Sequence, residues 1–114
     1  MEISKPFGPS IAKVIIPEEI ILSMNNYVEE IIVNKKKSDD LDYGNNLAGN
    51  VQQEFRLDLE FMKKNNWAEF LGKSCQKWLL DGHNIRLKKF EIISSWIVRQ
   101  FKNEYNPIHY HGGQ

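Results

Sequence analysis

The strongest constraint on the fold is a change of apolar pattern near Arg86. Before this point, apolar residues recur every three or four positions over long stretches, as along amphipathic helices. After it come two β-rich stretches, Leu87–Ile93 and Trp96–Phe101. The pattern predicts an α+β fold within a single domain, in which residues 1–83 form a strand plus a helical region and residues 84–114 are β-rich.

Composition narrows the class of protein. The 114 residues are 41% hydrophobic and 26% charged, which is typical of one soluble globular domain. Fifteen basic and fifteen acidic residues cancel, so no net charge favours nucleic acid or an anionic membrane. The single cysteine, Cys75, excludes an internal disulfide and fits a reducing compartment. No signal peptide or membrane-spanning run is visible, and we expect a cytoplasmic protein.

The N-terminal region reads as a strand followed by a helix. Ser10–Ile16 is rich in β-branched residues, and Pro17 suits the first position of a helix. Apolar residues then follow at helical spacing, namely Ile20, Met24, Tyr27, Val28, Ile31 and Ile32. The lysines at 35–37 are predicted to form the solvated far end of this helix.

The middle of the chain is less regular. Residues 38–50 are polar and are predicted to form a loop, whose aspartates lack the glycine and glutamate spacing of a calcium-binding loop. Val51–Lys64 fits both a helical stripe and a strand alternation, and both alternatives stay open.

A second clear helix is predicted to begin at Asn66, with Glu69 completing a capping box, and to stop at Gly82. Its apolar face is expected to pack in the core and consists of Trp67, Phe70, Leu71, Cys75, Trp78 and Leu79. His83 follows at the turn and is interpreted as a surface or capping residue outside any site.

In the β-rich part, Ser94 and Ser95 mark a predicted break between the two stretches. The nearly continuous apolar character of Trp96–Phe101 predicts a central strand that is buried on both faces. His109 and His111 come shortly afterwards. We expect a strand to carry these histidines. Residues two positions apart on a strand project from the same face, so the two imidazoles become candidate metal ligands.

Neutral imidazole binds iron, zinc, copper and nickel. Neither a Cys-x-x-Cys nor a His-Glu-x-x-His motif accompanies the pair, which argues against a zinc knuckle or a zinc protease. No motif indicates a serine or cysteine nucleophile that these histidines would serve.

The segment Ser95–Phe101, followed by Glu104–Gly113, resembles the start of the catalytic core of 2-oxoglutarate/iron(II)-dependent oxygenases of the marine bacterial and phage type. In that group, a tryptophan-bearing strand precedes a Tyr/Phe-Asn-Pro-x-His-x-His-x-Gly segment. Asn46–Asn50, followed by Glu54, resembles another part of the same group. The specific likeness covers about twenty residues, about the length of these motif segments.

The resemblance implies N-terminal helices packed on the first strands of an incomplete double-stranded β-helix, or jelly-roll. It implies a dioxygenase that hydroxylates a small molecule or a peptide, with Fe(II) as cofactor and 2-oxoglutarate as cosubstrate. His109 and His111 are the metal-ligand candidates, although the wider superfamily has a carboxylate where His111 stands, so either or both can be ligands. A distal histidine and the basic partner of the cosubstrate would lie beyond Gln114, and we expect an incomplete chain that is inactive alone.

A second hypothesis comes from a different class of protein. The chain would be a small non-enzymatic α+β interaction module with a flexible histidine-containing tail. In that case, the helix that carries Trp67 and Trp78 would present the interaction surface.

Overall fold

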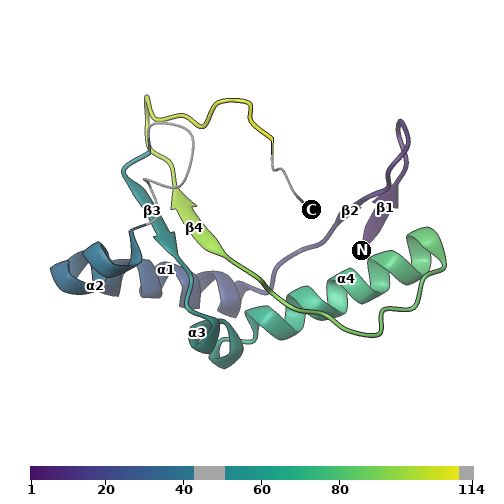
Figure 1. Ribbon diagram of the computed structural model, residues 1–114, viewed down its shortest axis with the longest axis horizontal. Coiled ribbons are helices and arrows are strands. Elements are labelled where there is room, and N and C mark those ends of the chain that lie inside the picture. Colours follow the sequence, from purple (N-terminus) through teal and green to yellow (C-terminus); the bar gives the residue numbers. More distant parts are fainter. Residues whose placement is uncertain (43–50, 111–114) are drawn as a thin grey trace. The chain divides into compact units, whose positions relative to one another are not determined.

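The structure is a computed structural model that describes residues 1–42 and 51–110, apart from the side chains of Lys35 and Lys37. In this range the chain has an α+β fold, as predicted, with four helices and two short antiparallel sheets (Figure 1). The chain divides into two compact units, of which the first contains Met1–Asn25 and Leu59–Ile93 and the second Asn26–Asp58 and Ser94–Gln114. The boundary predicted after residue 83 lies inside the first unit.

A two-stranded hairpin begins the first unit. β1 (Glu2–Ser4) pairs antiparallel with β2 (Ile11–Lys13), and Glu2 lies opposite Lys13. The strand predicted over Ser10–Ile16 is therefore too long. The pairing with β1 ends at Lys13, which lies opposite Glu2. Beyond β2 the side chain of Ile15 is 94% exposed.

The helix predicted after Pro17 is confirmed as α1 (Glu18–Val33), in which the Pro17 carbonyl accepts hydrogen bonds from the N–H groups of Ile20 and Ile21. The prediction for the next residues is wrong. The lysines at 35–37 begin a second helix, α2 (Lys35–Leu41), because the Asn34 carbonyl accepts the Ser38 N–H at 2.9 Å. The predicted loop over residues 38–50 is thus helical at its start, and residues 43–50 lie outside the described range.

The ambiguous stretch Val51–Lys64 contains both predicted structures. β3 (Gln53–Arg56) is followed directly by helix α3 (Leu59–Lys64). β3 pairs antiparallel with β4 (Trp96–Arg99), as Figure 1 shows, and the Leu57 N–H donates to the Ser95 carbonyl at 2.9 Å.

Helix α4 (Trp67–His83) confirms the second predicted helix but not its caps. Asn66 has a left-handed backbone, with φ of 66°, and forms no side-chain cap, whereas Oδ1 of Asn65 accepts the Trp67 N–H at 3.1 Å. A capping box requires an extended N-cap residue, so the prediction is wrong here. At the other end, left-handed Asn84 ends the helix, and Gly82 lies within its last turn.

The apolar face of α4 is less buried than expected. All six predicted core residues are half-buried, and no residue of the helix is fully buried. The buried apolar side chains of the described residues lie instead on α1, on α3 and around β3, namely Ile20, Tyr27, Val28, Ile31, Phe55, Leu57 and Met62.

The segment 84–95 has no regular secondary structure, so the strand predicted over Leu87–Ile93 is wrong. This segment runs back along α4 (Figure 1), and the Phe90 ring lies against Gly72. Within the described residues, β4 pairs on one edge only, and its four residues are half-buried rather than buried on both faces. A jelly-roll needs further strands paired with β3 and β4, and within the described ranges this sheet has two strands.

Candidate metal-binding segment

The candidate site depends on how the chain leaves β4. After Phe101 it turns through Asn103, whose φ of 69° is left-handed, and the Glu104 N–H donates to the Phe101 carbonyl at 3.1 Å. Asparagine tolerates this conformation better than most residues. The turn directs residues 105–110 away from the direction of β4.

Glu104 anchors the segment to the beginning of β3. Its Oε2 accepts the Gln52 N–H at 3.1 Å, and its carbonyl accepts a hydrogen bond from Nε2 of Gln100 at 2.7 Å. These contacts hold Glu104 next to Gln52, which precedes β3, and Gln100, which follows β4.

His109 lies on an exposed segment that has no strand hydrogen bonding. The prediction that a strand carries this histidine is therefore wrong. Pro107 has no N–H to contribute to a strand ladder, which is a local reason for the irregular backbone.

The His109 ring is oriented by its own backbone. Nδ1 lies 2.8 Å from the Pro107 carbonyl oxygen, which can only accept, so Nδ1 carries the proton. This tautomer places the imidazole lone pair on Nε2, as in many metal-bound histidines. The protonation state of the His109 ring therefore suits a metal ligand that binds through Nε2.

His111, the second predicted ligand, lies outside the described residues, as does Asn46–Asn50. The described ranges contain no group of three or more histidine, cysteine, aspartate or glutamate side chains placed to hold a metal ion. The described residues therefore include one of the two predicted ligands, His109, and do not form a complete metal site.

Glu54 is the most unusual carboxyl group in the second unit. The residue is 3% exposed, and its Oε1 has no hydrogen-bond partner among the residues that the structure describes. Burial raises the pKa of Glu54 above its ordinary value of 4.5, and the negative charges of Asp42 and Glu104 raise it further. The local residue pattern does not indicate this burial, and in the structure Glu54 lies on β3 opposite Val98 of β4.

A second polar cluster lies in the first unit. Ser10 is 5% exposed, its Oγ lies 2.5 Å from Nε2 of His83, and Nε1–H of Trp78 donates to the same Oγ at 2.7 Å. Sequence reasoning left His83 outside any site and missed Ser10. No pattern of neighbouring residues predicts a contact between Ser10 and His83, which are 73 positions apart.

We compared the chain with models of known families, with curated proteins and with solved structures, and none of these comparisons gave a match. Among the described residues, no helix has the length and apolar character needed to cross a bilayer.

Proposed function

We propose that this chain forms the N-terminal part of an iron(II)- and 2-oxoglutarate-dependent dioxygenase, with His109 and His111 as metal-ligand candidates. The resemblance of Glu104–Gly113 to that family supports the proposal. The structural observation that supports it is the hydrogen bond that Nδ1–H of His109 donates to the Pro107 carbonyl, because the tautomer with Nδ1 protonated is common among metal-bound histidines.

The residues around His109 would position the ligand. The Pro107 carbonyl fixes the tautomer and rotation of the imidazole, and Glu104 holds the segment to residues near β3. His109 and His111 would hold the iron(II), which together with 2-oxoglutarate would supply the oxidising chemistry for hydroxylation of a C–H bond. The proposal also includes the architecture: β3 and β4 would be the first strands of a double-stranded β-helix.

Anaerobic calorimetric titration of the chain with Fe(II), with and without 2-oxoglutarate, tests the proposal. We expect binding that weakens in His109→Ala or His111→Ala and that 2-oxoglutarate strengthens. His83→Asn is the matched control, because His83 bonds to Ser10 and belongs to no metal site in the proposal.

Turnover gives a second readout. In a protein that contains this chain together with the remaining ligands, His109→Ala or His111→Ala should abolish 2-oxoglutarate consumption. Unchanged turnover in both variants would contradict the assignment, as would Fe(II) binding that depends on neither histidine.

A second candidate function is a non-enzymatic interaction module, and the exposure of large apolar side chains favours it. Phe7 is 98%, Ile15 94% and Ile93 87% exposed. Trp67 and Trp78, which the sequence suggested for such a surface, are half-buried. Loss of Fe(II) binding in the histidine variants supports the oxygenase, whereas a chain that binds no Fe(II) supports the module.

A further inference from the structure

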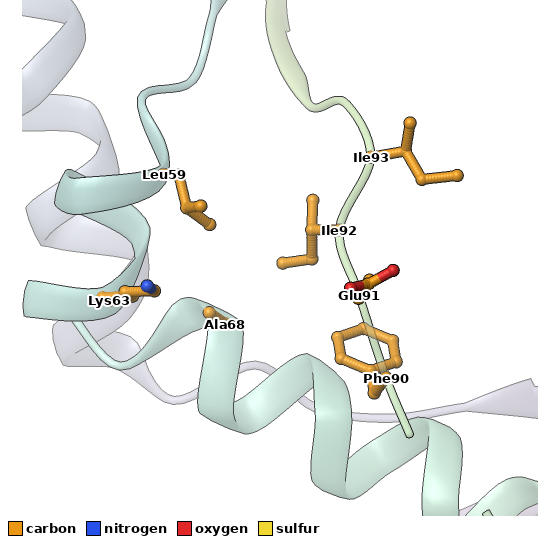
Figure 2. Close-up of a pocket in the computed structure, with 7 residues that line it drawn as sticks. All are labelled: Leu59, Lys63, Ala68, Phe90, Glu91, Ile92 and Ile93. Atoms are coloured by element: carbon orange, nitrogen blue, oxygen red, sulfur yellow. The ribbon is translucent and has the colours of Figure 1, made fainter. Parts of the chain in front are cut away.

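A groove in the first unit is lined by residues of α3, of the start of α4 and of the segment 90–93 (Figure 2). Its volume is about 490 Å³. The lining residues are Leu59, Lys63, Ala68, Phe90, Glu91, Ile92 and Ile93. Most of these side chains are apolar, and Leu59 and Phe90 remain 45% and 37% exposed. The groove is therefore an open apolar surface.

Opposite charges stand on the two walls of this groove. Lys63 comes from α3 and Glu91 from the facing segment 90–93, as Figure 2 shows. The structure describes no ion pair between them. Glu91 instead pairs with Lys89 at 2.8 Å, and both of these side chains are largely exposed. An exposed pair of this kind contributes little and exchanges partners readily.

Beside the groove, Ile93 provides an apolar projection. It is 87% exposed, and in Figure 2 its side chain points away from Ile92 and Leu59, which face each other across the groove. One surface thus carries a projecting apolar side chain, an apolar hollow, and one charge of each sign on opposite walls.

We propose that this groove is the interface of a two-fold symmetric dimer of the chain. A two-fold interface uses the same patch on both copies, so the patch must be complementary to itself. Here Ile93 of each copy enters the groove of the other, and Lys63 of each copy faces Glu91 of the other. The two charge contacts are equivalent by symmetry. A partner of uniform charge would meet a like charge on one wall, which is why we favour a second copy.

Sedimentation equilibrium of the chain over a range of protein concentrations tests the dimer. Lys63→Glu and Glu91→Lys should each weaken dimerisation by about tenfold or more, since each reversal places like charges at two symmetric contacts. The double variant should return to within about threefold of the original constant, because it restores both pairs.

Mixing the two single variants gives a sharper result. One variant carries two negative charges at these positions and the other two positive charges. An equimolar mixture should therefore form heterodimers while each variant alone stays monomeric. Lys64→Glu is the matched control, because Lys64 is adjacent on α3, pairs with Glu60 and does not line the groove.

Ile93→Asp should abolish the dimer. Ile15→Asp should not, although Ile15 is equally exposed, because it lines a separate groove with Phe70 and Lys73. Circular dichroism of each variant checks that the fold persists. The proposal is overturned by a chain that stays monomeric at every concentration, by a dimer that tolerates both charge reversals, or by a dimer that depends on Ile15 and not on Ile93.

Discussion

Oγ of Ser10 lies 2.5 Å from Nε2 of His83, across 73 positions of the sequence, and this contact ties the start of β2 to the end of α4. The indole N–H of Trp78 can only donate, so Ser10 accepts from Trp78, while the same Oγ forms a second hydrogen bond with Nε2 of His83. A single buried hydroxyl thereby satisfies two partners.

Ser10→Ala should lower the free energy of unfolding by about 1–3 kcal/mol, because it removes both hydrogen bonds of a buried group. Trp78→Phe removes the indole donor and keeps most of the ring. In urea denaturation, the double variant should cost less than the sum of the single variants, since both lose the same bond. Ser4→Ala, at an exposed position, should stay within about 0.5 kcal/mol. Strict additivity would show that the bond contributes nothing.

Gly82 permits this close approach of the hairpin to α4. A Cβ at Gly82 would lie 3.2 Å from Oγ of Ser10 and 3.5 Å from a methyl carbon of Ile3. Gly82→Ala should therefore destabilise the protein by about 1–3 kcal/mol, despite the better helix propensity of alanine.

Gly72→Ala is the matched comparison on the same helix. There a Cβ would meet the ring of Phe90 at 3.3 Å, and this partly exposed ring can shift. We expect a change within about 1 kcal/mol, because the gain in helix propensity offsets the shift. Thermal unfolding of both variants measures the difference, and equal costs would contradict the role of Gly82.

Glu54 should make stability depend on pH. Burial, with Asp42 and Glu104, raises the pKa of Glu54 in the folded protein above its ordinary value of 4.5. The protonated form is therefore favoured by folding. Its contribution is complete below the unfolded pKa and is lost as pH rises through the folded pKa.

Glu54→Gln, which stays neutral, should remove this loss and raise stability at neutral pH relative to the unsubstituted chain. Urea denaturation across the pH range measures the effect. Glu60→Gln is the control, because Glu60 is exposed and pairs with Lys64. A stability profile that keeps its pH dependence in Glu54→Gln would contradict the prediction.

Arg99 and Glu29 form an ion pair of 2.7 Å between β4 and α1. Their side chains are 31% and 61% exposed, so water screens the pair. A double-mutant cycle with Arg99→Met and Glu29→Gln should give a coupling of about 0.2–1 kcal/mol that falls at high salt. A larger coupling that is insensitive to salt would indicate a desolvated pair instead.

Of the candidate site, the sequence indicated His109 and its chemistry, and the bond that orients its ring joins residues only two positions apart. The expected strand around His109 was wrong, because Pro107 lacks an N–H and Asn103 turns the backbone. The carboxyl cluster around Glu54 was not foreseeable, since Asp42 and Glu104 lie 12 and 50 positions away from it in the sequence.

The helices α1 and α4, without its caps, and the α+β class could be predicted from the residue pattern, because helical periodicity and the position of Pro17 act over a few neighbouring residues. The lengths of β2 and β4, the hydrogen bond between Ser10 and His83, and the burial of Glu54 depend on contacts between distant parts of the chain. A strand ends where its pairing partner ends, and a polar group is buried by residues that are distant in the sequence. Neither property can be predicted from the local pattern of side chains.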